Sequence, residues 1–239
     1  MMKLTCATVL LIFLLSCGKS ATNGMTNSEP SKSTTTADQL SYLALGDSYT
    51  IGEAVAQNQC FPYQLAVLLG NQGVKVADPK IIAKTGWTTG ELKQGIQAEA
   101  LAVRYNIVTL LIGVNNQYRG DSIDTYRTEF RELLQTAISF ASGDKTHVFV
   151  VSIPDWGATP FGKQSGRGTQ TIATQIDAFN AVNKEETLKV GINYTDITPG
   201  SRNAATDVSL VASDGLHPSA LMYREWTLQL LPALLKVYK

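Results

Sequence analysis

Two short, uninterrupted apolar runs place the strongest constraint on the fold of this 239-residue chain. Ile107–Ile112 reads Ile-Val-Thr-Leu-Leu-Ile, and His147–Ser152 contains Val-Phe-Val-Val. A strand whose two faces are both buried reads this way, and such strands occur in parallel sheets with helices on each side. Three further runs predict the other strands: Tyr42–Leu45, Lys80–Ala83 and Ile192–Thr195.

Helix-length segments lie between and after these runs. They are Phe61–Leu69, Thr89–Arg104, Ser122–Ala141, Gln170–Lys189 and Ser219–Leu235. Strands that alternate with helices predict an α/β domain in which five parallel strands lie between two helical layers, a three-layer α/β/α architecture. We expect one such domain, at residues 40–239. Because ligands bind outside the carboxyl ends of parallel strands, functional residues are expected directly after each strand.

The composition excludes several other classes of protein. Twenty Lys and Arg balance twenty Asp and Glu, so a nucleic-acid-binding function is not expected. Two histidines cannot form a histidine-rich metal cluster, and three cysteines cannot form a disulfide scaffold. A content of 44% apolar residues is enough to bury a core. We therefore expect a neutral globular protein without a metal ion or other cofactor.

The first residues predict export. A basic start at Lys3 precedes the apolar run Ala7–Leu15, which is too short to cross a bilayer, so residues 1–16 are expected to form a signal peptide. The sequence Leu14-Leu15-Ser16-Cys17 resembles a bacterial lipobox, in which the chain is cut before a cysteine that then carries lipid. Cys17 is therefore the expected lipidation site, and the expected location is the bacterial cell envelope, anchored to a membrane. An ordinary signal peptide with an incidental cysteine is the alternative.

Residues 17–39 predict a flexible tether. Nine of the 21 residues from Gly18 to Asp38 are Ser or Thr and almost none is large and apolar, so this segment cannot offset the entropy of ordering. Once the signal peptide is removed and Cys17 is acylated, Cys60 is left as a lone thiol without a nearby histidine. Because it begins an apolar, helix-like stretch, we interpret Cys60 as a buried structural residue.

Polar motifs follow three of the predicted strands, and a fourth precedes the last predicted helix. They read Gly46-Asp47-Ser48-Tyr49, Thr85-Gly86-Trp87, Gly113-Val114-Asn115-Asn116 and Asp214-Gly215-Leu216-His217-Pro218. Each motif is weak alone, but in this order the four resemble the SGNH hydrolases, also called GDSL esterases and lipases. The resemblance extends from about Leu40 to the C-terminus. It implies the flavodoxin-like fold of that family and an esterase or lipase that needs no cofactor.

Three residues in these motifs suit acyl transfer, which requires a nucleophile, a base and a group that orients the base. Ser48 follows a strand at a glycine-led turn, which exposes its hydroxyl. His217 is the candidate base, and Asp214 can accept a hydrogen bond from the N–H at Nδ1 of His217. Pro218 suits the first turn of the final helix and would hold this Asp-His turn rigidly. The other histidine, His147, opens a predicted strand at the end opposite the site, so we interpret it as structural.

The resemblance also implies which groups bind the oxyanion: the N–H groups of Ser48 and Gly86 and the side chain of Asn115. Where the family's third motif usually ends in Asp, this chain has Asn116. Asn116 keeps the size of Asp but loses its charge, and we expect its side chain to serve the loop. Since Asp is the commoner residue there, Asn116→Asp is expected to retain most activity.

Several further side chains fall in or near the loops after the strands. Five aromatic residues could line a pocket for an acyl group or a glycan, or equally lie at the edge of the core: Tyr49, Trp87, Tyr118, Trp156 and Phe161. Two arginines, Arg119 and Arg202, are expected to be solvated rather than to bind an anionic substrate.

The sequence therefore predicts a serine esterase that hydrolyses carboxylic esters through a Ser-His-Asp triad and an acyl-enzyme intermediate. Acylated glycans, lysophospholipids and small esters are all candidate substrates, while acyl chain length and oligomeric state are left open. Two alternatives remain: an acyltransferase that uses the same triad, and a binding lipoprotein without turnover. An α/β-hydrolase is excluded because the chain has no Gly-x-Ser-x-Gly elbow.

Overall fold

A parallel five-stranded sheet lies at the centre of the computed structural model, which describes residues 39–99, 101 and 104–239. The strands are β1 (Tyr42–Asp47), β2 (Lys80–Lys84), β3 (Ile107–Leu111), β4 (Val148–Val151) and β5 (Asn193–Thr195). They lie in the order β2-β1-β3-β4-β5, and every neighbouring pair is parallel. All five predicted strands are confirmed, as is the α/β fold class.

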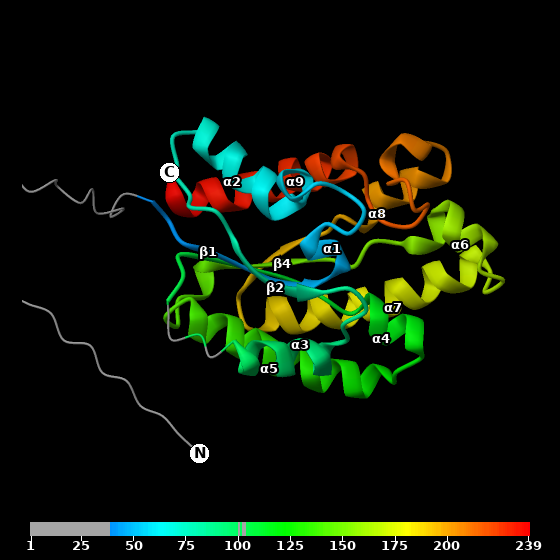
Figure 1. Cartoon of the computed structure of the whole chain (residues 1–239). Helices are drawn as coiled ribbons and strands as arrows, with labels where there is room; N and C mark the ends of the chain where they lie inside the picture. The colour runs from blue at the N-terminus through cyan, green and yellow to red at the C-terminus, as the bar shows by residue number, and fades with distance from the viewer. Residues whose placement is uncertain (1–38, 100, 102–103) are drawn as a thin grey trace, which may run out of the picture. The chain divides into compact units, whose positions relative to one another are not determined.

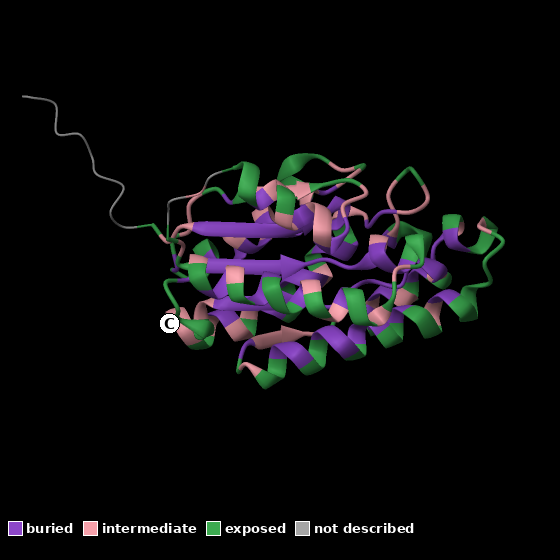
Figure 2. Cartoon of the chain, turned by 90° about the horizontal axis from the view of Figure 1, so that it is seen from below, coloured by how far each residue is buried: buried purple, intermediate pink, exposed green. Residues whose placement is uncertain are grey.

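Burial distinguishes the central strands from the edges of the sheet. Every residue of β1, β3 and β4 is buried, whereas β2 and β5 are partly exposed (Figure 2). The uninterrupted apolar runs that predict β3 and β4 therefore belong to strands that are covered on both faces.

Two helical layers cover the sheet (Figure 1). On one face α2 (Phe61–Asn71) packs against α9 (Ala220–Tyr238); on the other lie α3 (Thr89–Ala98), α5 (Ile123–Phe140) and α7 (Thr169–Lys189). All five predicted helices are present. The second predicted helix, Thr89–Arg104, corresponds to α3, which ends earlier, at Ala98.

The sequence does not predict the short helical turns in the connections, because a single turn carries too little periodicity to be recognised. They are α1 (Ser48–Ile51), α4 (Val114–Arg119), α6 (Pro160–Gln164) and α8 (Thr198–Ser201), with the 3-10 turns η1 (Gln57–Gln59), η2 (Lys145–His147), η3 (Trp156–Ala158), η4 (Arg202–Ala205) and η5 (Val208–Leu210). Of these, α1 begins directly after β1, and α4 begins just beyond β3. Both therefore lie at the carboxyl edge of the sheet.

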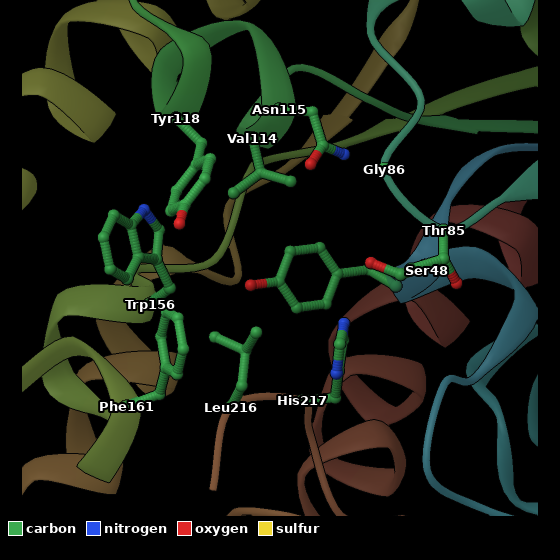
Figure 3. Close-up of a pocket in the computed structure, with 11 residues that line it drawn as sticks. Ser48, Thr85, Gly86, Val114, Asn115, Tyr118, Trp156, Phe161, Leu216 and His217 are labelled. Carbon is green, nitrogen blue, oxygen red and sulfur yellow. The ribbon is translucent and has the colours of Figure 1, made fainter. Parts of the chain in front are cut away.

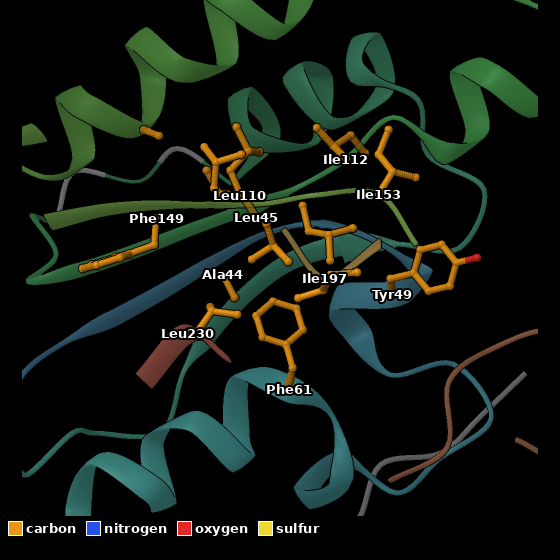
Figure 4. Packing of buried hydrophobic residues seen from close by; sticks show 14 of the residues in the cluster. Ala44, Leu45, Tyr49, Phe61, Leu110, Ile112, Phe149, Ile153, Ile197 and Leu230 are labelled. Atoms are coloured by element: carbon orange, nitrogen blue, oxygen red, sulfur yellow. The ribbon is translucent and has the colours of Figure 1, made fainter. Parts of the chain in front are cut away.

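The core fills the space between the sheet and both helical layers. Ala44 of β1 packs near Phe61 of α2 and Leu230 of α9, and all three are fully buried (Figure 4). Cys60 caps α2 and is also fully buried, with its Sγ donating to the Gln57 carbonyl oxygen at 3.0 Å. The prediction of a buried structural cysteine is confirmed.

None of the described helices is both long enough and apolar enough to span a bilayer. The signal peptide, Cys17 and nearly all of the tether fall outside the described residues, so these features stay predictions, as do the exact domain bounds.

Candidate active site

Ser48 lies where β1 meets α1, at the carboxyl edge of the sheet. Asp47 ends β1 and caps α1, because its Oδ1 accepts a hydrogen bond from the Tyr49 N–H at 3.0 Å. Gly46 allows the turn to pack tightly, since a Cβ at this position would lie 2.4 Å from the Leu111 carbonyl oxygen of β3. The turn leaves Ser48 only 5% exposed, at the wall of a pocket.

The carboxyl group of Asp47 is fully buried beside Ser48. Burial raises the pKa of Asp47 to about 7, although the hydrogen bond from the Tyr49 N–H acts to lower it. No described residue hydrogen-bonds to its Oδ2. Asp47 therefore changes charge near neutral pH, one residue away from Ser48.

His217 and Asp214 lie in one loop between η5 and α9. A β-bridge between Val211 and Pro218 closes this loop, and the His217 carbonyl oxygen accepts a hydrogen bond across it at 2.7 Å. The expectation that Pro218 lies in the first turn of the last helix is wrong. Pro218 belongs to the bridge, and Ser219, which has the hydroxyl that a helix cap needs, precedes the first residue of α9.

Asp214 holds the imidazole of His217. Asp214 Oδ2 lies 2.5 Å from His217 Nδ1, while Oδ1 accepts the N–H groups of Leu216 at 2.9 Å and His217 at 3.0 Å. Partial burial acts to raise the pKa of Asp214, but these hydrogen bonds, the one from His217 foremost, outweigh it and leave the pKa below its usual value. An ionised Asp214 keeps the proton on Nδ1, so Nε2 is free to accept another.

Gly86 and Asn115 come from two other loops. Gly86 follows β2 with a φ of +86°, a left-handed conformation that a side chain would strain. Its carbonyl oxygen accepts a hydrogen bond from Arg119 Nη2 at 2.5 Å, which fixes this loop. Asn115, in the first turn of α4, donates from Nδ2 to the Trp87 carbonyl oxygen at 3.0 Å. No described residue accepts a hydrogen bond from the second N–H of that amide.

These loops surround one pocket of about 180 Å³ (Figure 3). Ser48, Gly86, Asn115 and His217 all line it, and Asp214 holds His217 from the same loop. The structure thus brings together every residue that the sequence assigns to the triad and the oxyanion site. Both side chains are described, and no hydrogen bond joins Ser48 Oγ to His217. The remaining wall is largely apolar: Tyr49, Thr85, Val114, Tyr118, Trp156, Phe161 and Leu216.

Four of the five aromatic residues line this pocket: Tyr49, Tyr118, Trp156 and Phe161. The fifth, Trp87, packs instead over Gly95 of α3, where a Cβ would lie 2.1 Å from its ring. Trp156 donates from Nε1 to Gln117 Oε1 at 2.8 Å, which fixes the indole in the wall. The sequence gives no pattern that marks Gln117, because its partner lies in a distant loop.

The two arginines are more constrained than expected. Arg119 pairs with Glu91 of α3 at 3.1 Å in addition to holding Gly86, although its side chain is 47% exposed. Arg202 pairs with Asp155 at 2.9 Å and with Asp177 at 2.7 Å. The expectation of solvated arginines is therefore correct only in part, and neither arginine lines the pocket beside Ser48.

Asn116 supports the loop, as expected, and is fully buried. Its Oδ1 accepts the Thr89 N–H at 3.0 Å, and its Nδ2 donates to Thr89 Oγ1 at 2.8 Å and to Asp121 Oδ2 at 3.0 Å. The Thr89 hydroxyl in turn donates to Glu129. Nδ2 therefore donates to two acceptors. The carboxylate of an Asp at this position could not donate to either of them. These contacts argue against the expectation that Asn116→Asp is tolerated.

His147 lies at the amino end of β4, away from the pocket, as expected. It lies 3.8 Å from Asp144, and its ring packs against Tyr238 with centroids 5.4 Å apart. Across the described ranges, no group of three or more His, Cys, Asp or Glu side chains is placed to hold a metal ion.

A serine at the carboxyl end of β1 and an Asp-held histidine from the loop before α9 line one pocket, and serine hydrolases use a site of this kind. Residues 44–225 match the model of the GDSL-like lipase/acylhydrolase family. The chain belongs to this family, and it is a hydrolase of ester bonds.

Solved structures share the fold. TesA is 17% identical with a TM-score of 0.63, over 81% of this chain and 97% of TesA. A lipase/acylhydrolase from Enterococcus faecalis is 18% identical with a TM-score of 0.64, over 84% of this chain and 98% of its own. The psychrotrophic esterase EstA from Pseudoalteromonas sp., in a structure inhibited by monoethylphosphonate, is 14% identical with a TM-score of 0.63. The match covers 83% of this chain and 98% of EstA. A comparison with curated proteins gives no match.

Proposed function

We propose that this esterase uses Ser48 as its nucleophile, His217 as its general base and Asp214 to orient that base. One observation carries the proposal: the His217 imidazole, fixed by a carboxylate, lines the same pocket as Ser48, although the two residues lie near opposite ends of the domain's sequence. Because Nδ1 faces Asp214, Nε2 is the nitrogen available to Ser48 Oγ. Catalytic hydrogen bonds are often long in unliganded enzymes and tighten when substrate binds.

In the proposed reaction, Ser48 Oγ attacks the carbonyl carbon of the ester while His217 Nε2 takes the hydroxyl proton. The tetrahedral intermediate then breaks its bond to the alcohol oxygen, and His217 gives the proton to the leaving alcohol. Water attacks the acyl-enzyme by the same route, which releases the acid and restores the Ser48 hydroxyl. Asp214 stabilises the imidazolium in both halves.

Three donors would bind the oxyanion: the N–H groups of Ser48 and Gly86 and the second N–H of the Asn115 amide. Each is fixed before substrate arrives, since Ser48 begins α1, Arg119 holds the Gly86 loop and the Trp87 carbonyl holds Asn115. Donors that need not reorganise stabilise a transition state most.

The pocket favours small acyl or alcohol groups. Its volume of about 180 Å³ is below the roughly 300–1,000 Å³ of pockets for drug-sized ligands. Esters and acylated glycans with short acyl groups are therefore better candidates than lysophospholipids with long acyl chains. A panel of p-nitrophenyl esters from acetyl to palmitoyl tests this ranking, and a maximum of kcat/KM at palmitoyl would contradict it. Product analysis with a sugar acceptor present distinguishes hydrolysis from acyl transfer.

Substitution of the triad tests the mechanism. Ser48→Ala and His217→Ala should each lower kcat by about 10⁴ or more, and the double variant should be little worse than either, because the two residues act as a unit. The control is Ser139→Ala, which removes an exposed serine of α5. Wild-type turnover by Ser48→Ala would refute the proposal. The mechanism uses no metal, so EDTA should leave the rate unchanged.

Covalent labelling gives a second test. EstA is inhibited by monoethylphosphonate, which supports the use of a fluorophosphonate probe on the present protein. The probe should add its mass to the peptide that contains Ser48 in the wild type and in Ser139→Ala, and should label neither Ser48→Ala nor heat-unfolded protein. Stoichiometric labelling of another residue would place the nucleophile elsewhere.

We also propose export to the bacterial cell envelope and a lipid anchor on Cys17, supported by the Leu14-Leu15-Ser16-Cys17 sequence. One acyl chain adds about 0.8 kcal/mol of membrane binding for each buried methylene. Cys17→Ser should therefore move the protein from the membrane fraction to the soluble fraction of cells. Its retention in the membrane would contradict a lipid anchor at this residue.

A further inference from the structure

Tyr49, the residue after Ser48, is wedged between the proposed base and the core. Its ring lies edge-on to the His217 imidazole, with centroids 5.6 Å apart, and edge-on to Trp226 at 6.2 Å. The residue is only 3% exposed. Because packing fixes the ring, it also fixes the position of the hydroxyl.

The hydroxyl of Tyr49 differs from those of two other buried tyrosines. Tyr42 Oη lies 3.0 Å from Thr109 Oγ1, and Tyr126 donates to the Ile112 carbonyl oxygen at 3.2 Å. No residue in the described part of the chain hydrogen-bonds to Tyr49 Oη, yet this oxygen is not among the fully enclosed unpartnered atoms. It therefore opens onto the pocket, and Figure 4 shows it turned away from the hydrophobic cluster.

The state of this hydroxyl suits ligand binding. Burial raises the pKa of Tyr49, so the group stays protonated and can both donate and accept a hydrogen bond. Buried polar groups are almost always paired, and a fixed, unpaired group in a binding pocket points to a partner on the ligand.

The surrounding wall offers few other polar side-chain groups. Val114, Leu216 and Trp156 present apolar surface. Tyr118 also turns its hydroxyl into the pocket (Figure 3), but Tyr118 is 40% exposed, so water can serve that group. The Tyr49 hydroxyl is the more desolvated of the two and depends more on the ligand.

We infer that Tyr49 Oη determines specificity by hydrogen bonding to a hydroxyl group carried by the ester. The preferred substrate is then a short ester with a hydroxyl a few bonds from the reacting carbonyl, on its acyl or its alcohol side. This inference rests on the proposed esterase function at Ser48. A purely apolar pocket distinguishes poorly between a group and its hydroxylated analogue, whereas a positioned hydrogen-bonding partner distinguishes well.

Two matched pairs of esters measure the preference as a ratio of kcat/KM. p-Nitrophenyl 3-hydroxybutyrate against p-nitrophenyl butyrate tests the acyl side, and glycerol 1-monobutyrate against propyl butyrate tests the alcohol side. Tyr49→Phe removes the hydroxyl and keeps the ring against His217. The wild type should favour the hydroxylated member of one pair, and Tyr49→Phe should lower that ratio about tenfold.

Two further variants serve as comparisons. Tyr63→Phe removes a hydroxyl that accepts a hydrogen bond from Gln57 at 2.6 Å outside the pocket, so it should keep the wild-type ratio. Tyr118→Phe should lower the ratio less than Tyr49→Phe does. An equal loss on both members of each pair in Tyr49→Phe would overturn the inference, since the hydroxyl would then act through His217 and not on the substrate.

Failure of the inference and failure of the proposed function give different results. If the wild type hydrolyses these esters, Ser48→Ala does not, and Tyr49→Phe keeps both ratios, only the inference is overturned. If Ser48→Ala hydrolyses them at the wild-type rate, the proposed function is overturned. Where Ser48→Ala is inactive, calorimetric binding to this variant of the hydroxylated ester that the wild type prefers tests Tyr49 without turnover. Adding Tyr49→Phe should weaken this binding about tenfold, and unchanged binding would overturn the inference.

Discussion

Replacing Asn116 with Asp introduces a carboxylate where the structure requires a donor. The amide Nδ2 lies 2.8 Å from Thr89 Oγ1 and 3.0 Å from Asp121 Oδ2, and the Thr89 proton is already given to Glu129. Both neighbours therefore present lone pairs to position 116. Asn116→Asp loses two donated hydrogen bonds and places a fully buried carboxylate beside the half-buried carboxylate of Asp121.

The size of the effect follows from these contacts. A hydrogen bond to a charged group contributes about 1.5–3 kcal/mol. Two unit charges about 3 Å apart repel by roughly 5 kcal/mol at an effective dielectric constant of 20. Protonation limits this cost, since keeping a carboxyl protonated costs about 1.4 kcal/mol for each pH unit above its usual pKa. We expect Asn116→Asp to lose about 3–5 kcal/mol of unfolding free energy at pH 8 and about 1–2 kcal/mol at pH 5.

Urea unfolding of four proteins checks this reasoning: the wild type, Asn116→Asp, Asp121→Asn and the double variant. The double variant exchanges amide and carboxylate, so it should recover at least about 2 kcal/mol of the loss at pH 8. Asp121→Asn alone should cost little, because Asn116 can still donate to the new amide oxygen. A single variant within about 1 kcal/mol of the wild type at pH 8, or a loss that does not depend on pH, would refute the argument.

Two other variants, Asn115→Ala and Asp47→Asn, test the site further. Asn115→Ala should lower kcat by about 10²–10³ with little change in KM, because the amide contact strengthens in the transition state. Steady-state kinetics on one ester measure this loss. A large loss of kcat in Asn116→Ala without one in Asn115→Ala would assign the oxyanion role to Asn116 instead. Asp47→Asn keeps the helix cap and removes a buried carboxyl whose pKa is raised to about 7. Protonated Asp47 stabilises the fold fully below about pH 4, and this contribution is lost as the pH rises through 7, so urea unfolding should show the variant gaining roughly 4 kcal/mol on the wild type between pH 4 and pH 8. Activity of both proteins should still rise with pH as the proposed base loses its proton; if the rise disappears in Asp47→Asn, Asp47 and not His217 controls it.

The sequence predicts best those elements whose own residue types reveal whether they are buried or exposed. β3 and β4 read as uninterrupted apolar runs because both faces are covered, and Ser48, Asn115 and His217 stand in motifs directly next to predicted elements. Because three of the motifs directly follow strands, the sequence places Ser48, Gly86 and Asn115 at one edge of the sheet, and the resemblance to the SGNH hydrolases adds His217 to that site.

The features that the sequence does not predict depend on contacts between distant segments. Arg119 reaches the Gly86 carbonyl from α4, and nothing in either local sequence marks the pairing. Asn116 looks like a mild exchange for Asp until Asp121 and Thr89 are placed around it. Pro218 is of a residue type that suits the start of a helix, but it forms a β-bridge with Val211 instead.

The loop that carries Asp214 and His217 comes after all five strands and directly before α9, the last helix of the fold. During synthesis, the sheet and Ser48 can therefore emerge from the ribosome complete while the imidazole is still unmade. A nascent chain that stops before Val211 would hold the proposed nucleophile and all three proposed oxyanion donors, yet not the proposed base. The loop is followed directly by α9, which packs against α2. If His217 is the base, the growing polypeptide cannot hydrolyse an ester until the loop that carries His217 has been synthesised.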